Sequence, residues 1–362
     1  MQRRDTISSD AEPAGDIDGD AIDIEPVLEV LRNRVGVDFR QYKRATLYRR
    51  IARRIGLHRL GSFASYVTKL KTDPREAEAL YQDILIHVTS FFRNPEAYEA
   101  LKAQIYPALT ANRQRTSPVR IWTVGCSSGE EAYSLAMALT EHLEDADLPL
   151  ALEIIGTDVN ASSIERARRG VYANSAVEHI SETRKARFFE LGDGGYRIAQ
   201  GLRDMCVFTR HNVLTDAPLS GFDLVSCRNM LIYLGAELQQ KVIYILHGGL
   251  RPNGFLWLGN AESIGTHQGL FEVESACSKI YRKSLAKLGR EPCTVRDVLQ
   301  SGIEERDPLN EVLRVAHAEM QAANAELQII IDEMEVSKRL IRSSEDAIEV
   351  INNELAARDA KL

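Results

Sequence analysis

The chain has 362 residues, of which 44% are hydrophobic and 27% are charged, and its formal net charge is -7 at pH 7. This length accommodates a catalytic domain of roughly 200 residues together with smaller flanking domains. Its longest apolar runs fall far short of the ~20 residues that a membrane-spanning helix needs, and its amino terminus lacks the apolar core of a secretion signal. We therefore expect a soluble, cytoplasmic protein that does not insert into a membrane.

The five cysteines are scattered, without a C-x-x-C pair or a nearby histidine. This spacing argues against both a metal site and a disulfide framework, so we expect no bound metal. We interpret the cysteines as small buried side chains.

The first 88 residues predict a tail and a helical domain. Residues 1–21 are acidic and poor in large apolar groups, a composition typical of disorder. Over residues 22–88 apolar side chains recur with helical spacing, which predicts a small all-helical domain. Within it, residues 32–59 carry ten Arg or Lys and a single acid, Asp38.

From residue 119 onward, short apolar runs alternate with helical stretches, a pattern typical of a parallel sheet covered by helices. We expect an α/β, doubly wound, Rossmann-like domain over residues 89–288. Two strands near its end follow each other without a helix between them, as antiparallel edge strands would. The irregular segment 171–205 predicts a small β insertion.

A linker over residues 289–307 precedes a different pattern in residues 308–362. Large apolar side chains recur at every seventh position from Leu313 to Leu355, which predicts a long heptad helix. The companion row three positions further on is weak, since it includes Ser337, Ser344 and Arg358. A homodimeric coiled coil and a single amphipathic helix both fit this pattern.

A glycine-rich turn follows the first predicted strand of the α/β domain. It spans Gly125 to Gly129 and leads into a helix that begins with Glu130, and the next strand ends in Asp158. A carboxylate at that place is positioned to accept hydrogen bonds from ribose hydroxyls. Glu130 would repel the pyrophosphate of a dinucleotide. S-adenosylmethionine, which has an ammonium group and a ribose but no phosphate, fits better. The alternative for Glu130 is an ordinary first-turn acid that interacts with the helix dipole.

The same turn spells G-x-S-x-G, the nucleophile elbow of serine hydrolases, with Ser127 in the nucleophile position. A hydrolase would need Asp223 and either His247 or His267 to complete a triad. The His-Gly-Gly stretch that could support an oxyanion hole lies downstream of the elbow rather than upstream. A serine hydrolase therefore remains an alternative, as does a scaffold that binds cofactor without turnover.

Four segments occur together in an order and spacing that resembles the chemotaxis receptor methyltransferase (CheR) family. They are HVTSFFR at 87–93, GCSSGEEAYS at 125–134, GTDV at 156–159 and SCRNMLIY at 226–233. The resemblance covers residues 24–284. It implies an S-adenosylmethionine-dependent protein-glutamate O-methyltransferase that acts on the cytoplasmic helices of chemotaxis receptors.

The resemblance also implies a role for individual residues. Cofactor contacts are expected from His87, Thr89, Arg93, Gly125, Glu130, Asp158, Asn212, Val213, Arg228 and Asn229. Among these, Glu130 would hold the ammonium group and Asp158 the ribose hydroxyls. Asn212 and Val213 would border the adenine, and Arg228 and Asn229 the methionine portion. Arg93 and Tyr233 are the expected catalytic residues, which orient the incoming carboxylate. Family members often carry Asn at the place of His87 and Pro at that of Ala132, so only the contact from His87 is put in doubt.

A basic helix supplies the expected docking surface. At ~100° per residue, one face carries Lys43, Arg49, Arg50, Arg53 and Arg54. Receptor methylation helices are acidic, so this face is expected to steer them toward the cofactor pocket. A solvated basic face and a nucleic-acid-binding helix are the alternatives. The net charge of -7 argues against nucleic acid as a partner.

Overall fold

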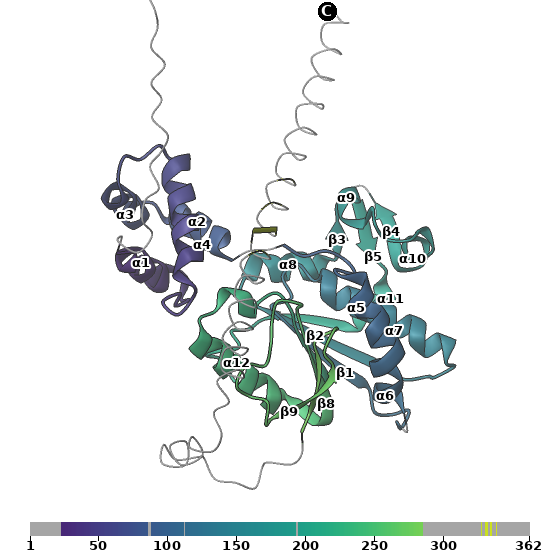
Figure 1. Cartoon of the computed structure of the whole chain (residues 1–362). Coiled ribbons are helices and arrows are strands. Elements are labelled where there is room, and N and C mark those ends of the chain that lie inside the picture. Colours follow the sequence, from purple (N-terminus) through teal and green to yellow (C-terminus); the bar gives the residue numbers. More distant parts are fainter. Residues whose placement is uncertain are drawn as a thin grey trace, which may run out of the picture. The chain divides into compact units, whose positions relative to one another are not determined.

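The computed structural model describes residues 23–85, 88–111, 113–192 and 195–284, together with five single residues further on, Leu327, Ile330, Ile331, Met334 and Lys338. The chain divides into two compact units between Ile84 and Leu85 (Figure 1). Among the described residues, no helix has the length and apolar character needed to cross a membrane.

The first unit is all-helical. Its helices are α1 (Glu25–Val35), α2 (Arg44–Leu57), α3 (Phe63–Thr72) and α4 (Pro74–Ile84). Local sequence sets their ends: α1 has a proline in its first turn and stops at Gly36, whose φ is 74°, and α3 starts at Ser62, whose side chain accepts the N–H of Ser65. The buried apolar stripes of the helices form the core, with Leu47 and Leu70 almost fully buried.

The second unit is built on a seven-stranded sheet. Its strands are β1 (Val119–Val124), β2 (Leu152–Asp158), β6 (Cys206–Arg210), β7 (Phe222–Cys227), β8 (Leu250–Leu258), β9 (Phe271–Ser275) and β10 (Ile280–Lys283). They are ordered β6-β2-β1-β7-β8-β10-β9. The first five run parallel, and β10 runs antiparallel to both of its neighbours. The expected Rossmann-like sheet with an antiparallel final pair is therefore confirmed.

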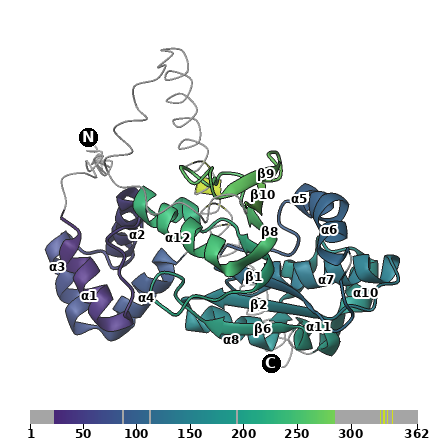
Figure 2. The same cartoon turned by 90° about the horizontal axis from the view of Figure 1, so that it is seen from below.

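Helices cover both faces of this sheet. They are α5 (Pro95–Ala100), a π-helix (Leu101–Ile105), α6 (Tyr106–Thr110), α7 (Glu130–Asp145), α8 (Ala161–Arg169), α11 (Gln200–Asp204), a 3-10 helix (Leu231–Tyr233) and α12 (Ala236–Gly249). Figures 1 and 2 show α7 on one face of the sheet and α12 on the other. The buried core on the α7 side joins Leu135 and Leu139 to strand residues such as Ile121 and Ile154. The sheet order reverses between β1 and β7, and ligands bind beside such a point at the carboxyl ends of the strands.

A small three-stranded antiparallel sheet lies within residues 171–205, where a β insertion was expected. Its order is β3-β5-β4, and its elements are β3 (Val171–Tyr172), α9 (Asn174–Val177), α10 (Glu182–Phe188), β4 (Phe189–Gly192) and β5 (Gly195–Ile198). It is tied to α7 by a bidentate pair between Arg184 and Glu141, both of whose hydrogen bonds are 2.7 Å long.

The predicted tail, linker and heptad helix lie outside the described residues, apart from five single positions. Leu327, Ile330, Ile331, Met334 and Lys338 are helical and exposed. The coiled coil and the homodimer therefore stay predictions.

Candidate active site

The glycine-rich turn lies at the carboxyl end of β1. Gly125, Ser127 and Gly129 all have positive φ values, of 66°, 48° and 95°. At Gly129 a Cβ atom would lie 2.9 Å from the Cβ of Ala167, so both conformation and space require glycine there. The turn brings the backbone close to the position where the sheet order reverses. In sheets of this kind ligands bind beside such a point, so the turn is a candidate binding place.

Asp158 ends the neighbouring strand β2 and is fixed beside the turn. Its Oδ2 accepts the N–H of Ser127 at 2.9 Å, and its Oδ1 accepts the N–H of Asn160 at 2.8 Å. Burial raises the pKa of Asp158, while these backbone hydrogen bonds oppose the rise. The structure therefore brings together the glycine turn and the carboxylate that sequence patterns predicted for the ribose.

Glu130 opens α7 and is only 5% exposed. Its two carboxylate oxygens lie 2.9 and 2.8 Å from the Oγ of Ser128, which donates to them. The carboxylate is held at the amino end of the helix, where it also interacts favourably with the helix dipole. Both readings of Glu130, as ammonium ligand and as first-turn acid, are consistent with this position.

Glu131, to which the sequence assigned no contact, pairs with Arg228. Its Oε1 accepts the Oγ hydrogen of Ser226 at 2.6 Å, and its Oε2 lies 3.0 Å from Nη1 of Arg228. Nη2 of Arg228 donates to the carbonyl oxygen of Arg93 and to Oδ1 of Asn94, each at 3.1 Å.

The guanidinium of Arg228 also stacks 4.0 Å above the ring of Trp257, and its side chain is 1% exposed. The contact with the methionine portion that the resemblance implied for Arg228 stays a prediction. What the structure shows is that this guanidinium holds the backbone of Arg93 and the side chain of Asn94 in place.

The segment that carries Arg93 has an unusual backbone. Phe92 and Asn94 have φ values of 49° and 60°, which non-glycine residues adopt only when their surroundings hold them. The N–H of Phe92 donates to Oγ of Ser134 on α7 at 2.9 Å, and Nη1 of Arg93 donates to the carbonyl oxygen of Val88 at 2.9 Å. The segment is thus fixed against the same helix that Glu130 opens. Thr89 is half-buried in it, whereas His87 lies outside the described residues.

Asn212 and Val213 follow β6 and are half-buried. The N–H of His211 donates to the carbonyl oxygen of Asp158 at 3.0 Å, so this segment begins beside the end of β2. Oδ1 of Asn212 accepts the N–H of Leu214 at 3.0 Å, which makes Asn212 a turn residue. The structure brings both residues to the carboxyl edge of the sheet that Asp158 occupies.

Asn229 and Tyr233 lie in the loop that follows β7. Asn229 has a φ of 58°, and Tyr233 ends the 3-10 helix; both side chains are half-buried. Their loop donates backbone N–H groups to Glu262, another carboxylate to which the sequence assigned no role. Its signal in the sequence was an acid shortly after the buried strand β8.

The small sheet contacts this site as well. The hydroxyl of Tyr172 donates to the carbonyl oxygen of Ser128 in the glycine turn at 2.7 Å. Nε2 of His179 lies 2.7 Å from the carbonyl oxygen of Phe91, to which it donates. The ring of Phe91 packs edge-on against Tyr172, with ring centroids 4.8 Å apart. The insertion is therefore joined to both the turn and the segment that carries Arg93.

The basic face predicted on α2 is smaller than expected. Arg50 is 7% exposed, and the side chain of Arg54 is 15% exposed. Arg54 forms two hydrogen bonds, of 2.5 and 2.9 Å, with the buried carboxylate of Glu76. The other helices of the unit cover this side of α2, so the prediction was wrong for these two arginines.

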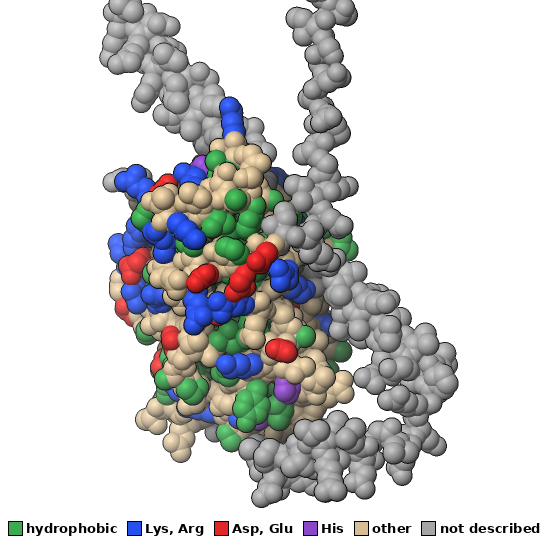
Figure 3. Space-filling model, turned by 90° about the vertical axis from the view of Figure 1, so that its left-hand side faces the viewer, with side chains coloured by type: hydrophobic (Ala, Val, Ile, Leu, Met, Phe, Trp, Pro, Cys, Tyr) green, Lys and Arg blue, Asp and Glu red, His purple; other side chains and the backbone are tan. Residues whose placement is uncertain are grey.

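Arg49 and Arg53 are exposed and Lys43 is half-exposed, and Nη1 of Arg53 lies 3.9 Å from Oδ1 of Asp83. Docking through these three residues stays a prediction. Figure 3 shows one face of the molecule, on which blue Lys and Arg side chains are interspersed with red acidic ones.

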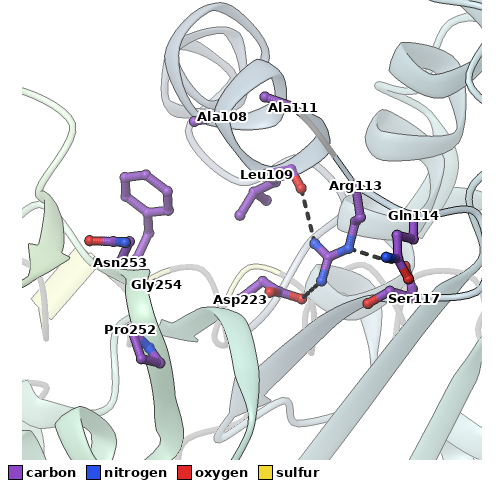
Figure 4. Close-up of a pocket in the computed structure, with 11 residues that line it drawn as sticks. Ala108, Leu109, Ala111, Arg113, Gln114, Ser117, Asp223, Pro252, Asn253 and Gly254 are labelled. Atoms are coloured by element: carbon purple, nitrogen blue, oxygen red, sulfur yellow. Dashed lines mark hydrogen bonds and ion pairs between the residues drawn. The ribbon is translucent and has the colours of Figure 1, made fainter.

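A cavity of about 370 Å³ lies elsewhere, at the amino edge of the sheet (Figure 4). Arg113 and Asp223 line it and form an ion pair of 2.7 Å. Arg113 also donates to two backbone carbonyl oxygens, and Asp223 accepts the N–H of Arg120 and pairs with Arg251. These polar groups satisfy one another, so we interpret the cavity as a structural junction and not as the functional site.

Because of this position, Asp223 cannot serve as the acid of a catalytic triad with Ser127. Asp223 lies near the start of β7, whereas Ser127 lies past the end of the adjacent parallel strand β1. Oγ of Ser127 is buried and has no hydrogen-bond partner within the described part of the chain. Nε2 of His267 instead contacts the carbonyl oxygen of Gln240. The hydrolase alternative therefore has no assembled triad.

Comparison with known proteins agrees with this geometry. Residues 87–280 match the family described as the CheR methyltransferase, SAM binding domain, and residues 22–85 match the CheR methyltransferase, all-alpha domain. The fold and the site thus define an S-adenosylmethionine-dependent methyltransferase. Because the first match alone covers more than half of the chain, the protein belongs to the CheR methyltransferase family.

Three relatives show how far the similarity extends. Chemotaxis protein methyltransferase 2 of Pseudomonas aeruginosa is 33% identical over 249 residues, which cover 67% of this chain and 86% of the relative. A chemotaxis protein methyltransferase of Listeria monocytogenes is 35% identical over 236 residues, which cover 65% and 87%. An uncharacterized 104.1 kDa protein of Rhodobacter capsulatus is 36% identical over 282 residues, or 76% of this chain, but the match spans only 29% of that relative's length.

Proposed function

We propose that the protein transfers the methyl group of S-adenosylmethionine to glutamate side chains of methyl-accepting chemotaxis receptors, and so forms glutamate methyl esters during adaptation. Family membership and the names of the Pseudomonas and Listeria relatives support this role. The observation that carries it is the fixed carboxylate of Asp158 beside a glycine turn whose helix begins with Glu130. This arrangement suits a ligand with ribose hydroxyls and an ammonium group better than one with phosphates.

The residues at the carboxyl edge of the sheet would hold the cofactor. Asp158 offers carboxylate oxygens to the ribose hydroxyls, and Glu130 offers a negative charge to the ammonium group. Gly125 and Gly129 allow close approach of the main chain, and Asn212 and Val213 border the adenine. Arg228 and Asn229 border the methionine portion, and Arg228 also holds Arg93 and Asn94 through its hydrogen bonds.

The reaction needs little from the protein beyond binding and orientation. Bound S-adenosylmethionine supplies an electrophilic methyl group. A glutamate side chain has a reference pKa of about 4.3, so the receptor carboxylate is already ionised at neutral pH and no general base is required. In this proposal Arg93 orients the carboxylate by its charge and Tyr233 by a hydrogen bond, while closure of the site removes water from the nucleophile.

The exposed part of the basic helix would guide the substrate. Arg49 and Arg53 on α2, and Lys43 just before it, carry positive charge, and acidic receptor helices would be attracted to this charge at long range. Arg50 and Arg54 take no part in this docking because they are packed inside the helical unit.

The decisive experiment is calorimetric titration of the whole protein with S-adenosylhomocysteine. Wild type should bind it, and Asp158→Ala should weaken binding at least a hundredfold. Ser127→Ala, which keeps the backbone N–H that contacts Asp158, serves as the matched control and should bind as wild type does. A wild type that fails to bind would contradict the proposal.

A second measurement addresses the substrate. Incubation with methyl-labelled S-adenosylmethionine and a receptor cytoplasmic fragment should label the receptor, and alkali should release the label as methanol, as it does from a carboxyl ester. Label that resists alkali would contradict esterification. Binding of S-adenosylhomocysteine without any transfer to the receptor would favour the scaffold alternative.

A further inference from the structure

Glu262 is a buried carboxylate that accepts hydrogen bonds from several backbone N–H groups. It is 4% exposed and follows β8. Its Oε2 accepts the N–H groups of Asn229 at 2.9 Å and Gly259 at 2.7 Å, and its Oε1 accepts the N–H of Leu231 at 2.7 Å. The N–H of Ile232 also donates to this carboxylate. Three of these four donors belong to the loop that follows β7.

This loop requires an external acceptor. Asn229 adopts a left-handed conformation, with a φ of 58°, so the chain turns sharply as it leaves β7. The N–H groups of Asn229, Leu231 and Ile232 consequently point away from the ladder of the sheet and would be costly to bury unpaired. Gly259 lets the two segments approach each other, because a Cβ there would lie 2.7 Å from Oε2 of Glu262 and 3.0 Å from the nitrogen of Asn229.

The two ends of the loop are held by different means. Arg228, at its start, is fixed through its side chain by Glu131 and Trp257. From Asn229 onward the backbone is fixed through Glu262. Tyr233 and Ala261, the neighbour of Glu262, both pack against Ile232. A shift of Glu262 would therefore move the segment from Asn229 to Tyr233 while leaving the ion pair of Arg228 in place.

We propose that Glu262 is a positioning residue for the methyltransferase site: it sets the backbone of residues 229–233 so that Asn229 borders the cofactor and Tyr233 meets the incoming carboxylate. This inference rests on the proposed function, which assigns those two residues to the site. Glu262 itself need not touch the cofactor or the substrate. Its effect passes through the four N–H groups.

The test replaces one oxygen by an amide nitrogen. In Glu262→Gln the new NH₂ group faces backbone N–H groups on one side, so at least one of the four bonds is lost while size and shape are kept. We expect hydrogen exchange of the amides of Asn229, Leu231 and Ile232 to accelerate at least tenfold. We also expect S-adenosylhomocysteine to bind at least tenfold more weakly, the KM for S-adenosylmethionine to rise and kcat to fall.

Asp223→Asn is the matched control. Asp223 is also a largely buried carboxylate that accepts a backbone N–H, from Arg120, but it lies at the amino edge of the sheet. This variant should lower the melting temperature and leave both S-adenosylhomocysteine affinity and exchange in residues 229–233 within twofold of wild type. All assays are run well below the melting temperature of each variant, so that loss of fold does not enter the comparison.

Each result has a defined meaning. Wild-type affinity and wild-type exchange in Glu262→Gln would overturn the positioning role, as would an equal loss of affinity in Asp223→Asn. If Glu262→Gln does not fold, Glu262→Asp takes its place. This variant keeps the charge on a side chain one methylene group shorter, and it must show faster amide exchange and weaker S-adenosylhomocysteine binding, both to a smaller extent. Failure of wild type to bind S-adenosylhomocysteine would instead count against the proposed function, and exchange would still decide whether Glu262 holds the loop.

Discussion

Arg228 and Glu131 form an ion pair in which Nη1 lies 3.0 Å from Oε2, and this pair joins the end of β7 to the first turn of α7. The same guanidinium donates to the carbonyl oxygen of Arg93. Three segments that are far apart in the sequence are therefore held by one buried cation. We therefore expect this junction to set the positions of the segments that carry the proposed site residues.

Arg228→Lys tests the junction. Lysine keeps a positive charge for Glu131 but lacks the planar fork that also reaches Arg93 and Asn94. We expect affinity for S-adenosylhomocysteine, measured by calorimetry, to fall roughly tenfold, which corresponds to about 1.4 kcal/mol. Arg251→Lys, which alters an arginine paired with Asp223 at the other edge of the sheet, should not change affinity. Equal affinity in wild type and Arg228→Lys would show that the fork is dispensable.

The glycine turn predicts a contrast between two alanine substitutions. In Gly129→Ala the new side chain would meet Ala167 at 2.9 Å with φ at 95°, so we expect destabilisation of about 1–3 kcal/mol and weaker cofactor binding. Gly248→Ala places the same methyl group in α12, where no atom lies within 4 Å, and should stabilise the protein by up to about 1 kcal/mol. Urea unfolding of both variants measures the difference. Comparable stability of the two variants would refute the conformational argument.

Ser127→Ala separates methyl transfer from hydrolysis. The contact of Ser127 with Asp158 uses its backbone N–H, and its hydroxyl has no partner in the described structure. Methyl transfer should therefore stay within about twofold of wild type, a change below 0.5 kcal/mol in the barrier. Transfer to a receptor fragment and hydrolysis of a chromogenic ester are measured in parallel. Ester hydrolysis by wild type that disappears in Ser127→Ala would revive the hydrolase alternative.

The environment of Glu76 predicts that the helical unit loses stability in acid. Burial acts to raise the pKa of Glu76, but hydrogen bonds from Arg54, Tyr66 and His58 outweigh it and hold this pKa below its usual value. A depressed pKa in the folded state means that its stabilisation is present above the unfolded pKa, near ~4.3, and is lost as pH falls through the folded value. Stability of the unit should therefore decrease progressively as pH falls below about 4.3.

Glu76→Gln provides the comparison. It leaves Arg54 with Asp83 at 3.5 Å, so we expect a loss at pH 7 of about 3 kcal/mol, the lower end of the range for a broken buried pair. Its stability should also depend less on pH. Hydrogen exchange of α2 and α4 in the full chain, at pH 7 and in acid, reports both effects. An identical pH dependence in wild type and variant would contradict the assignment to Glu76.

The docking proposal predicts a separation between substrate and cofactor. Charge reversal at Arg49 and Arg53 should raise the KM for an acidic receptor fragment several-fold, and more strongly at low salt, without changing S-adenosylhomocysteine affinity. The control reverses the exposed Arg166 and Arg169 on α8, with the same change in net charge. If the control lowers receptor methylation equally, net charge rather than a docking surface is responsible.

Sequence patterns were sufficient for the fold because each element carries a local signal. Alternating apolar runs and helical stretches predicted the sheet, and the missing helix between residues 275 and 280 predicted its antiparallel end. Gly125, Gly129 and Asp158 could also be predicted from the sequence, because a turn and the end of a strand are local features. Their proposed contacts with the cofactor follow from the family resemblance and stay predictions.

The rest depended on contacts between distant segments. A helical wheel gives the angle between Arg50, Arg54 and Leu47, but it does not say that α4 places Glu76 against Arg54, 22 positions away. In the same way, the partners of Glu131 and Glu262 lie 97 and 33 positions from them. Acids of this kind look like surface residues until the fold brings an arginine or a set of N–H groups to them.

The hydrogen bond from Tyr172 to the carbonyl oxygen of Ser128 has a consequence for protein engineering. It makes the small sheet part of the wall of the catalytic unit, so a version of this enzyme shortened by excision of residues 171–205 would lose the donor that caps the glycine turn and the cover over Phe91. A minimal methyltransferase cut from this chain should therefore retain the insertion, and grafting the insertion from another family member would need to bring a tyrosine to the same place.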